Sequence, residues 1–270
     1  MTTATAGARP ASPLRRGLAV LAAHWDDAPA AERLCHVVGV VLVAAGVFHL
    51  GVFAVLGGPW EGPVSWRKPA TFGVSFGLTL ITIAWVTSYV RLRQRPRAVL
   101  LGVFAADCAA EVGGITLQAW RHVPSHFNRE TTVDGLVSTM LAAGGVILVA
   151  VLVVFSVQAL RGDPGLPASM RLALRAGFLT LLVGLASGAA MIARGMTLVA
   201  AGRPELAYQV GGFLKPVHGV SLHGVLVLPA LAWLLGRTRW DEPRRTRVVA
   251  LAAAGYGFAI GGALLLSLAR

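Results

Sequence analysis

Charged residues are scarce in this sequence. Of its 270 residues, 13% are Asp, Glu, Lys or Arg, 56% are hydrophobic, and the mean hydropathy is +0.69. Because soluble domains carry about a quarter charged residues, this composition excludes a soluble globular enzyme. Cysteine is also rare: Cys35 and Cys108 have neither metal-ligand spacing nor an evident partner, so we expect them to act as small apolar packing residues.

Lysine is nearly absent, with two residues against 22 arginines. None lies within a long apolar stretch, and the last stretch has none between Arg247 and Arg270. A retinal Schiff base would be sought there, so a rhodopsin-type pigment is disfavoured. The Arg, Ala, Gly and Val bias is typical of a GC-rich genome and favours a bacterial inner (plasma) membrane.

Long uncharged stretches take the place of the missing charges. Six of them contain no Asp, Glu, Lys or Arg: 34–60, 69–90, 135–160, 176–193, 216–236 and 248–269. Crossing a bilayer takes about 20 apolar residues. A seventh stretch, 98–120, has the length but contains Asp107 and Glu111. The sequence predicts an all-α, multi-pass bundle of seven transmembrane helices over 34–270, preceded by a cytoplasmic amphipathic segment at 1–33.

The positive charges alternate between the ends of these spans. The N-terminal segment and the second, fourth and sixth connections carry 16 Arg and Lys residues, and the other end carries 8. The positive-inside rule therefore predicts a cytoplasmic N-terminus and an external C-terminus, which also disfavours a G-protein-coupled receptor. We interpret the arginines as topology signals that contact lipid headgroups, with no nucleic-acid partner.

The third span carries the strongest functional signal. At about 100° per residue, Asp107, Glu111, Gly114, Gln118 and Arg121 fall on one side of a helix. A charged side chain at the bilayer centre costs roughly 2.5–3.5 kcal/mol on insertion scales. Such groups usually face a cavity or a partner, although protonated or hydrogen-bonded structural carboxyls remain an alternative. The predicted stripe stops about halfway across, because apolar residues precede Asp107.

Histidines on other spans lie at the same predicted depth. With a rise of 1.5 Å per residue, His49, Glu111 and His223 lie about 10–16 Å below the outer surface. His126 lies above them in the loop, and His218 is about one turn higher than His223. Shared depth predicts a shared site, and the candidate metal ligands are His49, Glu111, His126, His218 and His223. The alternative is that each histidine is a satisfied core residue.

Small residues recur at helix-packing spacing. Gly184 and Gly188, Gly257 and Gly261, and the Gly144-Gly145 pair predict close helix contacts. No internal repeat is evident between the first three and the last three spans. A transporter fold built from duplicated halves is therefore disfavoured, although it is not excluded.

Three short elements carry a resemblance. They are Arg67-Lys68-Pro69 with Phe72 and Ser75, the Pro124–Asn128 segment, and His218 to His223 followed by Pro229. Together, over about residues 59–236, they resemble a group of uncharacterised bacterial multi-pass membrane proteins with similar R-K-P, P-S-H-F-N and H-x4-H elements in the same order. The resemblance implies a common bundle and no particular activity.

Three functions remain open. The first is a membrane-embedded enzyme or redox protein, with a divalent metal or haem on the His/Glu set and with Gln118 and Asp107 beside it. Without a metal, Glu111 would be the general base beside Asp107, and Arg121 or Arg194 would stabilise an anion. The candidate substrate-binding residues are Arg67, Lys68, Gln118 and Asn128.

The second function is a proton-coupled transporter or channel-like protein. Asp107 and Glu111 would relay a proton or cation, and the outer cations, Lys215 included, would attract an anionic small molecule or lipid. The third is a non-catalytic membrane subunit.

Overall fold

The structure, a computed structural model, describes residue 25 and residues 27–269, and this part is built from helices without a strand. The seven long helices and one short helix are α2 (Ala30–Leu56), α3 (Arg67–Val86), α4 (Gln94–Trp120), α5 (Thr132–Arg161), α6 (Ala168–Ala200), α7 (Pro204–Val210), α8 (Lys215–Leu235) and α9 (Glu242–Leu268). The seven long ones are apolar enough to cross a membrane, so the predicted multi-pass bundle is confirmed. Most of the predicted 1–33 segment lies outside the described residues.

Local sequence signals set several helix ends. The side chain of Thr131 accepts a hydrogen bond from the Asp134 amide and caps α5, and Asp241 caps α9 through the Arg244 amide. Gly57 and Gly162, which follow α2 and α5, have φ of 67° and 74°. Glycine adopts this left-handed conformation without steric cost, so the chain can turn sharply there.

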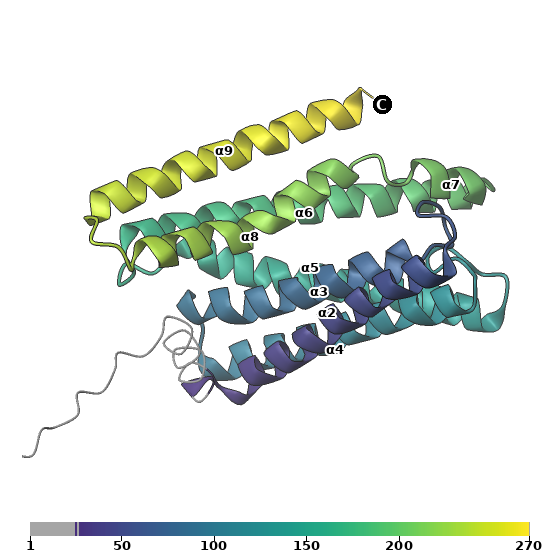
Figure 1. Cartoon of the computed structure of the whole chain (residues 1–270), viewed down its shortest axis with the longest axis horizontal. Helices are drawn as coiled ribbons and strands as arrows, with labels where there is room; N and C mark the ends of the chain where they lie inside the picture. Colours follow the sequence, from purple (N-terminus) through teal and green to yellow (C-terminus); the bar gives the residue numbers. More distant parts are fainter. Residues whose placement is uncertain (1–24, 26, 270) are drawn as a thin grey trace, which may run out of the picture.

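The long helices form two groups of three. Helices α2, α3 and α4 all contact one another, and so do α6, α8 and α9. Helix α5 contacts α4 in one group and α6 in the other, and α3 also contacts α8. In Figure 1 the two groups lie on opposite sides of α5, with the C-terminus at the α7 end of the molecule.

Glycines permit the closest helix crossings. A Cβ atom added to Gly39 of α2 would lie 2.9 Å from the Gly77 carbonyl oxygen of α3, so the backbones touch. The predicted packing of Gly184 and Gly188 is confirmed, because Leu222 and His218 of α8 lie against them. The prediction for Gly257 and Gly261 is wrong within the described residues: nothing lies within 4 Å of a Cβ at either.

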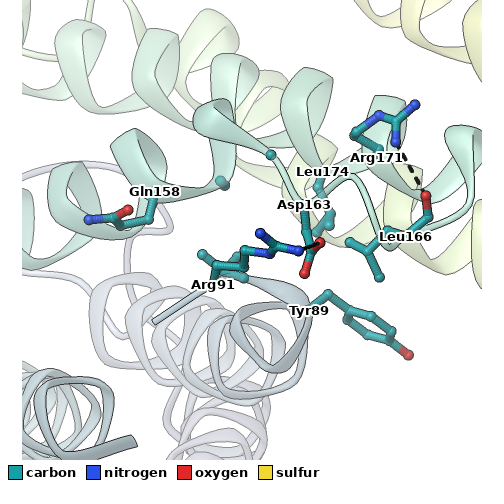
Figure 2. Close-up of a pocket in the computed structure, with 10 residues that line it drawn as sticks. Tyr89, Arg91, Gln158, Asp163, Leu166, Arg171 and Leu174 are labelled. Atoms are coloured by element: carbon teal, nitrogen blue, oxygen red, sulfur yellow. Dashed lines mark hydrogen bonds and ion pairs between the residues drawn. The ribbon is translucent and has the colours of Figure 1, made fainter. Parts of the chain in front are cut away.

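The two ends of the bundle differ in charge. The arginine-rich end holds the connections 90–93, 162–167 and 236–241, and the His126 end holds 57–66, 121–131 and 201–214. At the arginine-rich end, Arg91 and Asp163 form an ion pair of 2.7 Å that joins two connections (Figure 2). The hydrogen bond from Arg91 lowers the pKa of Asp163, and this pair fastens α3–α4 to α5–α6.

The segment 194–215 is more helical than the sequence predicts. Helix α6 continues to Ala200, so Arg194 lies within it, and α7 forms inside the predicted connection. Pro204 begins α7, consistent with the preference of proline for the first turn of a helix.

Candidate functional site

The predicted polar stripe forms along α4 and faces α5. Asp107 and Glu111 are buried, with 8% and 5% of their surfaces exposed, and Gln118 is fully buried. Gly114 packs on Met140 and Leu141 of α5. The helical period thus places these groups on one interface, where α5 shields them from lipid.

Asp107 and Glu111 meet at a single glycine of α5. A Cβ atom at Gly144 would lie 2.8 Å from Asp107 Oδ1 and would also collide with Glu111 Oε1. The two carboxyl groups are therefore neighbours in a space that only glycine leaves free. Asp107 Oδ2 and Glu111 Oε1 are buried and have no hydrogen-bond partner among the described residues. A buried polar atom without a partner costs free energy, so this pair is a candidate ligand site.

A hydrogen-bonded network closes this stripe at the His126 end. Asp134 Oδ1 accepts hydrogen bonds from Gln118 Nε2 at 2.9 Å and from Arg121 Nη1 at 2.5 Å. Its Oδ2 accepts one from the Thr131 hydroxyl at 2.6 Å. Arg121 therefore has its own carboxylate partner and is not directed at Glu111. The signal for Asp134 in the sequence is the Thr131-x-x-Asp134 spacing, which is typical of a helix start.

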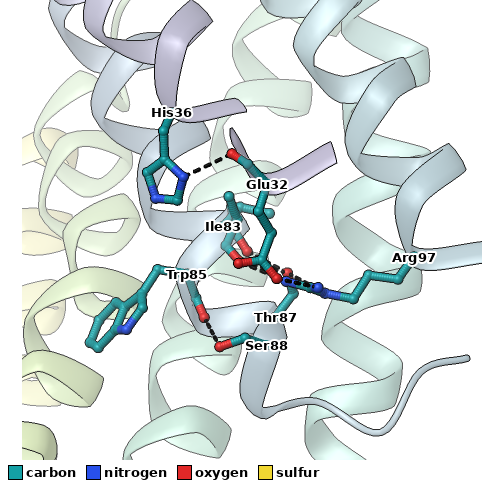
Figure 3. Close-up of polar contacts among 8 residues, drawn as sticks. Glu32, His36, Ile83, Trp85, Thr87, Ser88 and Arg97 are labelled. Atoms are coloured by element: carbon teal, nitrogen blue, oxygen red, sulfur yellow. Dashed lines mark hydrogen bonds and ion pairs between the residues drawn. The ribbon is translucent and has the colours of Figure 1, made fainter. Parts of the chain in front are cut away.

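Another buried acid, Glu32 of α2, lies beside the other end of α4. Arg97 forms an ion pair with Glu32 of α2 and donates to the Ala84 carbonyl at 2.8 Å and to the Thr87 hydroxyl at 3.3 Å. Figure 3 shows Glu32 and Arg97 directed toward each other beside α3. Neither Glu32 nor Arg97 stands out in the sequence as a buried residue, because each flanks a long apolar stretch instead of lying within it. Between Arg97 and Asp107, the fully buried Leu101 and Phe104 form an apolar layer.

The predicted metal-ligand set is not assembled. Among residue 25 and residues 27–269, no three His, Cys, Asp or Glu side chains are grouped so that they could hold a metal ion. Both ring nitrogens of His49 form hydrogen bonds. Nδ1 donates to the Ala45 carbonyl at 2.7 Å, and Nε2 accepts from Trp120 Nε1 at 3.1 Å. Its ring stacks on Trp66. Equal depth therefore did not imply a common direction.

The two histidines of α8 also point elsewhere. His218 Nδ1 bonds the Gly184 carbonyl of α6 at 2.8 Å. His223 is exposed, bonds the Gly219 carbonyl at 2.5 Å and lines a groove with Ala252 and Tyr256 of α9. A backbone carbonyl thus accepts a hydrogen bond from each ring, as expected if both histidines have structural roles in an apolar helix.

His126 lies in a tightly folded loop. Its Nδ1 is 2.9 Å from the Ser125 hydroxyl, and its carbonyl accepts a hydrogen bond from Tyr208 at 3.1 Å. Phe127, with φ of 63°, fills the space left by Gly195 of α6. Burial and the nearby charge of Lys68 lower the pKa of His126 to about 4, so the imidazole is neutral at physiological pH.

The predicted cations share the His126 end but have different partners. Arg67 pairs with Glu61 at 3.3 Å, and the guanidinium of Arg194 lies 4.6 Å from the centre of the Phe213 ring. Lys68 has no hydrogen bond or ion pair from its side chain in the described part of the chain. Asn128 is 4% exposed, and its Nδ2 lacks a partner there. Whether these residues bind substrate stays a prediction.

Comparison with known proteins adds no relative. No protein-family model matches the chain, and no curated protein or solved structure is significantly similar to it.

Proposed function

We propose that the protein is a proton-coupled membrane transporter in which Asp107 and Glu111 hold and release the coupling proton. The observation that carries this proposal is the carboxyl pair itself, buried against Gly144 with two oxygens unpartnered. Two neighbouring carboxylates inside a low-dielectric bundle repel each other and lose their hydration. Sharing a proton relieves both costs, so a proton or a small cation is the ligand that this pair fits.

The surroundings of the pair favour a relay over a catalytic pocket. Polar groups continue from it through Gln118 to the His126 end, and they resume at Arg97 on the other side of the apolar layer. The stripe is interrupted beyond Asp107, as the sequence suggests, but only by this layer of Leu101 and Phe104. A metal ion has no group of three His, Cys, Asp or Glu ligands in the described chain, and Arg121 is engaged by Asp134.

We also propose that the His126 end faces outward from a bacterial inner membrane. The 16 to 8 division of positive charges supports this orientation. Membership of the multi-pass group with R-K-P, P-S-H-F-N and H-x4-H elements is part of the same proposal. Single-cysteine labelling at position 126, in a Cys35→Ser, Cys108→Ser background, tests the orientation. Labelling of intact cells supports it, and labelling only after cell opening reverses it.

A hydrophobic carbodiimide tests the carboxyl pair without knowledge of the solute, because it adds to protonated carboxyl groups within membranes. Purified protein in lipid would be labelled and digested, and the adduct located by mass spectrometry. We expect labelling at Glu111 or Asp107 that declines as pH rises. The Glu111→Gln, Asp107→Asn double variant should lose it.

Glu130→Gln is the matched control, since it removes an exposed carboxylate at the His126 end. It should leave the labelling unchanged. A wild-type protein without an adduct at either buried acid at any pH would contradict the proposal.

A further inference from the structure

The two groups of three helices share a sequence pattern. Lys68-Pro69 lies in the first turn of α3 and Lys215-Pro216 begins α8, and a glycine follows each lysine by nine residues, at Gly77 and Gly224. Pro96-Arg97 and Pro243-Arg244 occupy the first turns of α4 and α9. Each of these pairs is separated by 147 residues, so the second and third helices of the two groups match without a gap.

The packing repeats as well. A Cβ atom at Gly39 would lie 2.9 Å from the Gly77 carbonyl oxygen, and one at Gly177 would lie 3.0 Å from the Gly224 carbonyl oxygen. A second packing glycine follows seven residues later in each first helix, at Gly46 and Gly184. In each group the third helix contacts the other two. The glycine contacts thus follow the same pattern in the two three-helix groups, which α5 joins.

The matching lysines of the two groups, Lys68 and Lys215, lie near each other. Helices α3 and α8, which carry them in their first turns, contact each other across the two groups. The charges of Arg67 and Lys215 both act on Lys68. Glu61, whose side chain is 71% exposed, pairs with Arg67 at 3.3 Å and Lys215 at 3.9 Å. One exposed carboxylate thus pairs with two of these three cations, which leaves net positive charge where the two groups meet.

Buried donors without partners lie on the segments beside these cations. Ser65 is 6% exposed, its Oγ has no partner in the described residues, and its carbonyl accepts from the Lys68 amide at 3.2 Å. Asn128 Nδ2, also buried and unpartnered, is two residues from His126, on which the charge of Lys68 acts. Ammonium, amide and hydroxyl groups are the donors that bind phosphate and carboxylate oxygens.

We propose that the region where the first turns of α3 and α8 meet is an anion-binding site, with Lys68 and Lys215 as its paired cations and Asn128 and Ser65 as neutral donors. The ligand class is an anion with phosphate-type oxygens, supplied by a free solute or by a lipid headgroup. The anion site itself does not depend on the proposed function. Its role as the site of the solute moved with the proton does rest on that function.

The test uses the full chain in nanodiscs of neutral lipid, with inorganic phosphate as the probe. Phosphate should raise the thermal midpoint of unfolding, and Lys68→Gln should weaken its apparent affinity by about tenfold or more, since a charge-assisted hydrogen bond is lost. Lys68→Arg should retain binding. Arg203→Gln removes one exposed cation at the same end and should change nothing.

Nanodiscs that contain phosphatidylglycerol distinguish the two sources. If the phosphate effect disappears in them but persists in neutral lipid, a headgroup occupies the site. If it persists in both, the free anion is preferred. A lack of stabilisation by either anion, or an equal effect in wild type and Lys68→Gln, would overturn the site.

Carbodiimide labelling of the same samples separates this proposal from the proposed function. Labelling at Glu111 without phosphate binding removes the anion site alone. Phosphate binding without labelling removes the proton relay alone.

Discussion

Helix α4 carries two buried acid-containing sites that are built in opposite ways. Near its start, Arg97 pairs with Glu32 and also donates to a carbonyl and a hydroxyl group. Near its middle, Asp107 and Glu111 face a glycine and leave two oxygens without partners. The first site satisfies its charges and joins three helices. The second leaves two carboxyl oxygens without partners, which suits the proposed binding and release of a proton.

The comparison separates stability from function along one helix. Removing one member of a buried ion pair leaves an uncompensated charge and is strongly destabilising. Removing a charge from an unpaired carboxyl site relieves a cost instead. Variants that break the Arg97–Glu32 pair should therefore lower the free energy of unfolding most. Variants of Asp107 and Glu111 should affect function most.

The largest loss of stability is expected from Arg97→Gln. It strands the Glu32 carboxylate, which is 3% exposed, and should lower the free energy of unfolding by about 3–5 kcal/mol. Thermal unfolding in detergent measures this loss. The Glu32→Gln, Arg97→Gln double variant should recover part of it, and additive losses would show that the two side chains do not act as a pair.

A pH-dependent loss is expected from His126, at the far end of the stripe. Its pKa falls from an ordinary value of 6.5 to about 4 in the folded protein. Between these values the unfolded chain binds more protons, so stability rises with pH through this window and falls on acidification. At pH 5 the loss should be about 1–2 kcal/mol.

His126→Gln should lack this part of the pH dependence in thermal unfolding between pH 4 and pH 6.5. An unchanged slope in the variant would show that other groups cause the loss. At pH 7 and above, where the imidazole is neutral in both states, the wild-type protein should show no loss from this residue.

A smaller effect is expected from Gly144→Ala. The new methyl group collides with both carboxyl groups, which must rotate away at a cost of about 1–2 kcal/mol. Carbodiimide labelling of Glu111 should fall because the pair is displaced. Gly145→Ala is the matched control, since nothing lies within 4 Å of its Cβ position. Equal labelling in the two variants would mean that Gly144 does not shape the site.

The smallest change in stability is expected from Glu111→Gln. The amide keeps the volume of the carboxyl group and is cheaper to bury when no partner compensates the charge. The thermal midpoint should stay the same or rise slightly. A loss as large as that of Arg97→Gln would show that Glu111 has a structural role and would remove the contrast between the two sites.

The sequence predicts the seven spans because the bilayer imposes length and apolarity on each of them. It also predicts the stripe on α4, because the helical period places Asp107, Glu111 and Gln118 on one side. It does not show that the stripe faces Gly144, since that depends on how α5 packs. Depth alone brought His49 and His223 into one predicted site, although the two rings point to different neighbours. The similar packing of the two three-helix groups depends on glycine contacts between helices, which the order of residues does not show.

The most direct test of the proton relay is infrared spectroscopy of the protein in lipid, before and after exchange into D2O. A protonated carboxylic acid gives a carbonyl band that is distinct from that of a carboxylate and shifts on deuteration. The account predicts such a band at neutral pH, its shift in D2O, and its loss in the Glu111→Gln, Asp107→Asn double variant. Absence of the band from the wild-type protein, or its persistence unchanged in the double variant, would contradict the account.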